Sequence, residues 1–215
     1  MKKLLGLFAA LVISASSFAV ELEENVHYQV IDKKSKGTAK PEIKEFFSYY
    51  CPHCMTFEPL AKSLKKRADA EGYKFVKSHV DFLRAAGPEI QMMLTKALVT
   101  SEKLNAPQVN DAIFNYIQNQ RAAITSEKDV RNLFVINGVD GEKFDKVFNS
   151  FAVVAAAKKM KKEQDNLSSK RILTGVPTFI VNGKYKILNG GFKAKSYGEL
   201  FTKLEEAAIE LSKKK

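Results

Sequence analysis

The sequence predicts an α/β protein in which a long block of helices interrupts a sheet-forming region. Apolar patterns typical of core strands occupy residues 42–50 and 73–82, and strand signals return at residues 175–188. A further short strand is expected at residues 25–31. Between these signals, residues 87–169 show helical periodicity and no convincing strand. We therefore expect a large helical insertion between the second and third core strands.

A helix is expected directly after the strand of residues 42–50, whose aromatic and apolar density is typical of a buried central strand. Pro52 suits the first helical position, where its missing N–H group is not needed. Gly72 is a typical helix end. Pro59 lies inside this segment and should kink the helix.

Local signals also divide the helical block and define the end of the chain. Ser126 to Asp129 resembles a capping box, and Asn137-Gly138 is a helix stop. Asn182-Gly183 lies between two strand patterns and predicts a tight hairpin, followed by a helix at residues 196–211. One apolar helix face is expected after this stop, formed by Phe144, Val147, Phe148 and Phe151. Two methionines earlier in the helical block, Met92 and Met93, should fill the core.

The first 19 residues have the features of a removed secretory signal. Lys2 and Lys3 precede an apolar run that is too short to span a bilayer, and small residues end the segment. An uncleaved membrane anchor is the alternative. Export of the mature chain places it in an oxidising compartment.

We expect one sheet-containing domain at residues 20–85 and 170–215, the inserted helical domain at 86–169, and a monomer. Removal of the signal leaves 33 basic and 24 acidic residues, a net charge of +9. No aromatic residues interleave with the lysine runs, which argues against a nucleic-acid partner. The default interpretation of the lysines is that they lie on solvated helix faces. A basic surface would give the protein only a weak preference for acidic partners or anionic membranes.

Cys51 and Cys54 are the two cysteines of the chain, and they lie three residues apart. A disulfide that closes so small a loop stabilises a fold little, so the pair is better suited to chemistry. The alternatives are an inert structural disulfide or half of a zinc site. Zinc is disfavoured because the chain has no second cysteine pair and only three histidines.

The expected helix start gives the two thiols different properties. Residues i and i+3 lie on one face, close enough for a disulfide. Cys51, at the helix N-terminus, should be the low-pKa nucleophile, and Cys54, one turn inside, the resolving thiol. This pattern is typical of a thioredoxin-like redox motif. Pro52 and His53 should tune the redox potential, although His53 could simply be a solvated helix residue.

The mature chain resembles the DsbA family of bacterial periplasmic thiol:disulfide oxidoreductases, in the thioredoxin superfamily. The resemblance rests on EFFSYYCPHC, FVKSHVDF, FDKVFNSFAVV and GVPTFIVNGKY. It implies a thioredoxin fold with a helical insertion and a Cys51–Cys54 disulfide that is donated to reduced exported proteins. It also implies periplasmic localisation, no metal or cofactor, and reoxidation by a DsbB-like, quinone-linked partner in the inner membrane.

The resemblance also assigns residues outside the cysteine motif. It implies a cis bond at Val176-Pro177 that holds substrate backbone beside the cysteines, whereas the sequence alone favours the trans isomer. It places Glu45, Lys77 and Glu58 near the active site as tuning residues. From the pattern alone, Glu45 and Lys77 could equally lie on an exposed edge face.

Two functional alternatives and three departures from the family pattern remain. A disulfide isomerase or reductase is disfavoured by the short segment before the motif strand, which leaves little room for a dimerisation domain. A peptide-binding chaperone with an incidental disulfide is the other alternative.

Met55, Pro59 and the lack of tryptophan are departures that affect the expected shape of the substrate groove.

Overall fold

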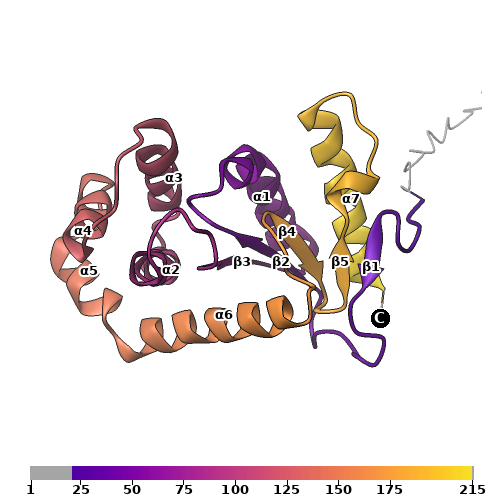
Figure 1. Ribbon diagram of the computed structural model, residues 1–215, viewed down its shortest axis with the longest axis horizontal. Helices are drawn as coiled ribbons and strands as arrows, with labels where there is room; N and C mark the ends of the chain where they lie inside the picture. Colours follow the sequence, from indigo (N-terminus) through magenta and orange to yellow (C-terminus); the bar gives the residue numbers. More distant parts are fainter. Residues whose placement is uncertain (1–20, 215) are drawn as a thin grey trace, which may run out of the picture.

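The computed structural model describes residues 21–214, and the expected signal segment lies outside these residues. One five-stranded sheet has the order β1-β5-β4-β2-β3 (Figure 1). Its strands are β1 Tyr28–Val30, β2 Glu42–Phe47, β3 Lys74–His79, β4 Thr178–Val181 and β5 Tyr185–Ile187. β2 and β3 are parallel, and the other neighbouring pairs are antiparallel.

The helices fall into two groups. Helices α1 (Pro52–Glu71) and α7 (Tyr197–Lys213) pack against each other and against the sheet. The segment between β3 and β4 holds α2 Pro88–Lys103, α3 Gln108–Phe114, the π-helix η1 Asn115–Asn119, α4 Glu127–Ile136, α5 Gly141–Phe148 and α6 Phe151–Ser169. A short 3₁₀ turn, η2 (Asn189–Gly191), precedes α7. The predicted α/β architecture with a helical insertion is confirmed.

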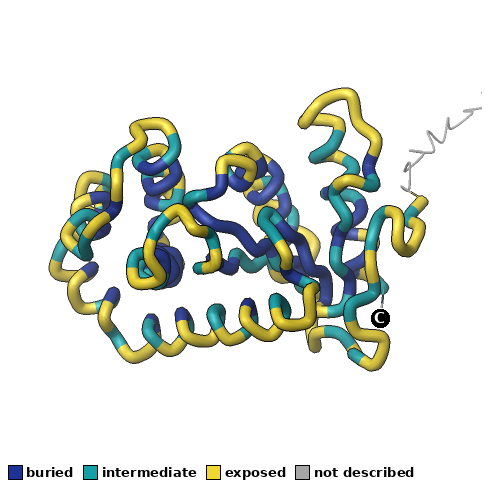
Figure 2. Tube along the Cα trace, viewed as in Figure 1, coloured by how far each residue is buried: buried dark blue, intermediate teal, exposed yellow. Residues whose placement is uncertain are grey.

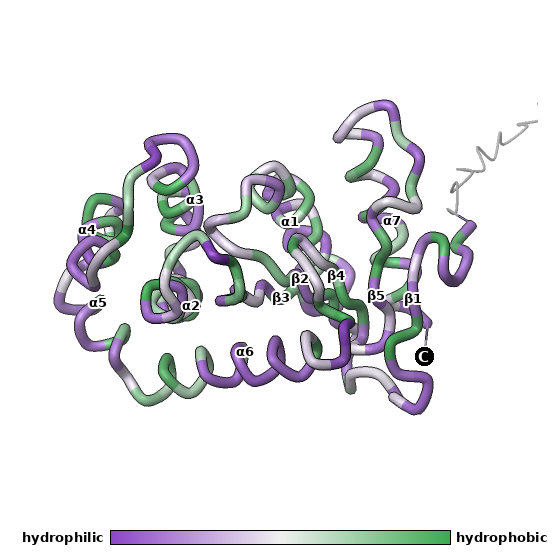
Figure 3. Tube along the Cα trace, viewed as in Figure 1, coloured by the Kyte–Doolittle hydropathy of each residue, from purple (hydrophilic) through white to green (hydrophobic). Residues whose placement is uncertain are grey.

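The apolar core continues from the sheet into the insertion (Figure 2). One cluster joins β2, β4 and β5 to α1 and α7, around Ile43, Leu60 and Leu204. A second cluster contains Phe47, Tyr49 and both cysteines together with buried residues of α2 to α5. The insertion therefore packs directly against the cysteine motif. Within residues 21–214, no helix combines the length and the apolar character needed to cross a bilayer (Figure 3).

Most of the predicted helix boundaries follow from local capping. Pro52 occupies the first turn of α1, and Gly72 ends that helix with φ 79°. Ser126 and Asp129 form the expected capping box at the start of α4. Because each signal acts within a single turn, these boundaries could be predicted without knowledge of the tertiary structure.

The predicted apolar face of residues 144–151 is partly wrong. Phe144 and Phe148 are fully buried in α5, whereas Phe151 is 89% exposed. The chain breaks after α5, and Ser150 caps a new helix that runs in a different direction (Figure 1). Phe151 is therefore not on the same face as the phenylalanines of α5.

Asn182 connects the hairpin to two other parts of the sheet domain. Asn182 and Gly183 have positive φ angles of 53° and 62°, as a tight hairpin requires. The Asn182 side chain also donates from Nδ2 to the Ser212 carbonyl at 3.0 Å, and its Oδ1 accepts from the Glu42 N–H at 2.9 Å. One buried amide therefore links the turn, the start of β2 and the end of α7.

We expect Asn182→Gly to destabilise the protein by about 2 kcal/mol. Glycine keeps the left-handed backbone conformation but leaves the Glu42 N–H and the carbonyls at the end of α7 without their partner. Urea unfolding at neutral pH measures the change. Gly183→Ala is the matched control, because it strains the same turn without removing a side-chain hydrogen bond. An Asn182→Gly protein as stable as the wild type would show that the turn geometry alone matters.

Candidate active site

The N-terminus of α1 places Cys51 among free backbone N–H groups. Cys51 is the N-cap residue, and its Sγ accepts a hydrogen bond from the Cys54 N–H at 3.1 Å. Both residues are free thiols in this structure. Cys51 retains 5% exposure, whereas Cys54 is fully buried. An incoming thiolate can therefore approach Cys51 more easily than Cys54.

The pKa values of the two thiols also differ, and the more accessible thiol has the lower pKa. The Cys54 thiol donates to Cys51 and, with the backbone N–H groups of Cys54 and His53, lowers the pKa of Cys51 from 9.0 to about 7, against an opposing effect of burial. Burial raises the pKa of Cys54 far above its ordinary value, and the hydrogen bond to Cys51 raises it further. Cys51 is thus the group that ionises near neutral pH, as predicted from the helix start.

Pro52 and His53 lie on the exposed side of the motif. The backbone N–H of His53 helps to lower the pKa of Cys51. Among residues 21–214, no hydrogen bond joins the His53 ring to Cys51, so a contribution from the ring stays a prediction. The solvated position leaves the ring available to a bound partner.

The loop before β4 lies against Cys51. The Val176-Pro177 peptide bond is cis, and the Val176 carbonyl accepts a hydrogen bond from the Cys51 thiol at 3.5 Å. The Asn189 side chain donates to the Pro177 carbonyl at 3.4 Å. Two residues 125 positions apart in the sequence, Cys51 and Val176, therefore meet at the cysteine motif.

Glu45, Lys77 and Glu58 form a buried charged cluster. Glu45 on β2 stands opposite Lys77 on β3 in the parallel register, and their charged atoms are 3.3 Å apart. Lys77 also donates a hydrogen bond to Glu58, which comes from α1. Glu45 is fully buried and the Lys77 side chain is 14% exposed, so neither lies on the exposed edge that the pattern alone allowed.

Burial dominates the ionisation of this cluster. It raises the pKa of Glu45 to about 7; Lys77 opposes the shift, and the negative charges of Glu58 and Cys51 add to it. Burial alone would lower the pKa of Lys77, but the two carboxylates outweigh it and raise that pKa. The cluster therefore holds a cation between two acids and is electrostatically linked to Cys51.

Sequence reasoning missed the residues that hold the segment before Cys51. Tyr49 is fully buried, its hydroxyl donates to Asn110 at 2.6 Å, and its carbonyl accepts from Gln118 at 2.7 Å. Its ring stacks on buried His79, whose Nδ1 is 2.9 Å from the Thr95 hydroxyl. Burial lowers the pKa of His79 to about 3, so the ring is neutral. Tyr49 belongs to a recognisable apolar run, but no sequence signal indicated Asn110 or Gln118.

A cavity of about 500 Å³ opens beside the cysteine motif, between the first turns of α1 and the π-helix η1. Its lining residues are Pro52, Met55, Thr56, Pro59, Gln118 and Asn119. The cavity therefore includes Met55 and Pro59, the two positions that depart from the family pattern. These departures shape the surface next to the cysteine motif.

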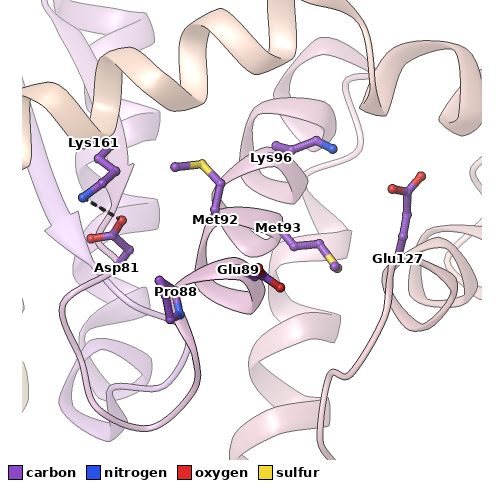
Figure 4. A pocket seen from close by; sticks show the side chains of 8 residues that line it. All are labelled: Asp81, Pro88, Glu89, Met92, Met93, Lys96, Glu127 and Lys161. Carbon is purple, nitrogen blue, oxygen red and sulfur yellow. Dashed lines mark ion pairs between the residues drawn. The ribbon is translucent and has the colours of Figure 1, made fainter.

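A second cavity, of about 430 Å³, lies between α2 and α6 and contains neither cysteine (Figure 4). Its lining residues are Asp81, Pro88, Glu89, Met92, Met93, Lys96, Glu127 and Lys161. Met92 and Met93, which were expected to fill the core, are half-buried in its wall. Met93 also packs against the core cluster of Phe47 and Tyr49, so the expectation holds for Met93 in part. Lys161 and Asp81 form an ion pair of 3.2 Å at one end. Across residues 21–214, no cluster of histidine, cysteine and acidic side chains is arranged to hold a metal ion.

A redox motif at the start of α1, beside a cis-proline loop and on a thioredoxin-type sheet, defines a thiol:disulfide oxidoreductase. Residues 42–200 match the model of the DSBA-like thioredoxin domain. The thiol:disulfide interchange protein DsbA of Salmonella typhimurium is 34% identical over 201 residues, which cover 91% of each chain. DsbA of Escherichia coli K12 is 32% identical over 219 residues, which cover all of both chains.

Solved structures agree with the sequence comparisons. A cysteine-to-serine variant of Proteus mirabilis DsbA, with the non-covalently bound peptide PWATCDS, superposes with a TM-score of 0.76 and 31% identity over 91% of this chain and all of that one. DsbA from Klebsiella pneumoniae gives a TM-score of 0.75 and 26% identity with the same coverage. The chain belongs to the DsbA family of thiol:disulfide interchange proteins.

Proposed function

We propose that the protein is a periplasmic dithiol oxidase that donates a Cys51–Cys54 disulfide to cysteine pairs of exported proteins. The observation that carries this proposal is the stabilisation of the Cys51 thiolate at the start of α1. A depression of its pKa from 9.0 to about 7 favours the thiolate by about 3 kcal/mol. Above pH 9.0, where this stabilisation of the reduced form is complete, it makes the disulfide more oxidising by about 60 mV.

The reaction proceeds through a mixed disulfide. A substrate thiolate attacks Cys51 Sγ of the oxidised protein; a bond forms between these sulfurs, and the Cys51–Cys54 bond breaks. Cys54 leaves with the electron pair and takes up a proton, because its buried site disfavours the anion. A second substrate thiolate then attacks the substrate sulfur, and Cys51 leaves as a stabilised thiolate. The substrate loses two electrons, and the protein gains them as a dithiol.

The loop of Val176 and Pro177 is the proposed substrate platform. The Val176 backbone lies next to Cys51, where an extended chain could pair with it. The cavity at Met55 and Pro59 would take side chains on the other side of the motif. The peptide bound by the relative from Proteus mirabilis supports this type of ligand. Pro52 and exposed His53 complete the proposed surface, and His53 would contact the substrate.

The charged cluster beneath the motif is proposed to adjust proton transfer. Glu45, whose pKa of about 7 lets it exchange a proton near neutral pH, is electrostatically linked to Cys51. Lys77 and Glu58 would set the charge around it. No metal or cofactor takes part in this mechanism.

Each catalytic cycle leaves the protein reduced, so an oxidant must regenerate the disulfide. A DsbB-like, quinone-linked protein of the inner membrane is the proposed partner, which accords with the family assignment. The proposed substrates are reduced, unfolded exported proteins, and the proposed active form is a monomer.

The decisive test is a titration of the Cys51 thiolate. We expect its ultraviolet absorbance to appear with a midpoint of about pH 7, and Cys51→Ser to supply the baseline. Because the folded pKa lies below the unfolded value of 9.0, the reduced protein should gain about 3 kcal/mol of stability as pH rises from well below 7 to well above 9. Titration of Cys51 at the ordinary cysteine pKa would contradict the proposal.

An equilibrium with glutathione separates the remaining functions. An oxidase should hold a disulfide that glutathione reduces readily, whereas a potential near that of thioredoxin would indicate a reductase. A variant with both cysteines replaced should lose all exchange activity. Full activity of that variant would instead indicate a peptide-binding chaperone.

A further inference from the structure

Helix α6 runs along one edge of the molecule and leaves its outer side uncovered (Figure 2). We call the exposed residues on this side the outer stripe: Phe151, Ala155, Lys158, Lys159, Lys162, Asp165, Asn166 and Ser169. Their spacing of three and four residues places them on one helix face. The opposite face holds Val153, Ala157 and Gln164, which are buried. The stripe is thus a continuous surface that the fold does not use.

The outer stripe begins with an exposed aromatic side chain. Phe151 is 89% exposed, the highest value among the large hydrophobic residues of the described chain. Exposed Ala152 and Ala155 follow it, so the first turns are apolar before the lysines begin (Figure 3). Covering such an exposed apolar side chain with a membrane or a partner protein lowers the free energy of the system.

The lysines of the stripe have no acidic partner. Within residues 21–214, no ion pair involves Lys158, Lys159 or Lys162. The nearby acids of α6 are already used, because Glu163 pairs with Lys44 at 2.6 Å and Asp165 pairs with Lys161 at 3.1 Å. Three exposed cations therefore share one face with an exposed phenylalanine.

The shape and charge of the stripe favour a membrane over a polypeptide. Neither of the two cavities has a lining residue from the stripe, which is the convex side of a helix. A peptide binds best in a groove, whereas a convex helix face with lysines and an aromatic residue suits the headgroup region of a bilayer. We propose that the outer stripe of α6 is a docking surface for an anionic membrane, with the lysines on lipid phosphates and Phe151 inserted between headgroups.

Vesicle co-sedimentation of the mature chain tests this proposal. We expect the protein to bind vesicles in which one third of the phosphatidylcholine is replaced by phosphatidylglycerol, and not vesicles of phosphatidylcholine alone. Replacing Lys158, Lys159 and Lys162 together by glutamine should weaken binding by roughly a hundredfold, at about fivefold for each lysine. Phe151→Ala should weaken it by about tenfold. Raising the salt from about 0.1 M to about 1 M should release the protein.

The matched control replaces Lys33, Lys34 and Lys36 by glutamine. These exposed lysines lie in a loop, and their loss changes the net charge equally. Equal loss of binding in both triple variants would overturn the proposal, because net charge alone would then explain it. Binding of a polyglutamate peptide that competes fully with vesicles and does not depend on Phe151 would also overturn it and identify an acidic polypeptide as the occupant. Unchanged disulfide exchange with a soluble peptide verifies that all variants are folded.

Discussion

Replacing Cys51 by serine is expected to abolish reaction with oxidised glutathione, whereas Cys54→Ser should accumulate a stable mixed disulfide. Both variants lack the disulfide, so they differ only in which thiol remains. Cys51 is partly accessible and its pKa is about 7, while Cys54 is fully buried and its pKa is strongly raised. We expect the rates of mixed-disulfide formation at neutral pH to differ by at least about a thousandfold.

Mass spectrometry of samples quenched with acid measures the glutathione adduct directly. In the wild type the same adduct should be short-lived, because the Cys54 sulfur attacks it from within the first turn of α1. Urea unfolding of both variants controls for a loss of structure. Rapid adduct formation by Cys51→Ser would mean that Cys54 is the nucleophile, and the proposed order of attack would have to be reversed.

Lys77→Met is expected to destabilise the protein by about 3 kcal/mol above pH 7. The change leaves Glu45 and Glu58 in a buried site without their shared cation. The cost should be smaller well below pH 7, because the Glu45 carboxyl is then protonated and its burial is less unfavourable. Urea unfolding at a pH on each side of 7 provides the comparison. An equal loss of stability at both pH values would indicate lost packing rather than lost charge.

Glu45→Gln is the matched control for this cluster. The pKa of Glu45 is about 7 in the folded protein and near 4.5 when unfolded. Between these values the folded state holds a proton that the unfolded state has released, so wild-type stability should fall as pH rises. The fall attributable to Glu45 is about 3 kcal/mol, and Glu45→Gln should remove it. The double variant Glu45→Gln/Lys77→Met should lose much less than Lys77→Met alone.

The start of α1 shows what could be predicted without coordinates. Pro52 at its first turn, the free N–H groups there and the spacing of Cys51 and Cys54 all act within one helical turn. Local geometry therefore sufficed to predict the lowered pKa of Cys51, and its role as the nucleophile stays a prediction. The hairpin at Asn182-Gly183 was predictable for the same reason, because the backbone angles of a short turn depend on the residues within it.

The helical insertion contains features that could not be predicted from the sequence. Gln118 donates to the Tyr49 carbonyl from a π-helix nearly seventy residues later, and no periodicity indicates this contact. Phe151 fits an apolar pattern but is exposed, because the chain turns between α5 and α6. The contact that was missed and the burial that was wrongly predicted have the same cause. In both cases packing between distant segments, rather than residue spacing, decides which side chains are buried.

The sequence by itself determined the order of strands and helices, the redox motif and its position at the start of α1, because these depend on neighbouring residues. Only the tertiary structure decided that Val176 contacts Cys51 and that Glu45, Lys77 and Glu58 form one buried cluster. These contacts join segments that are far apart in the chain. Their electrostatic effect depends on burial, and burial is a property of the packed molecule.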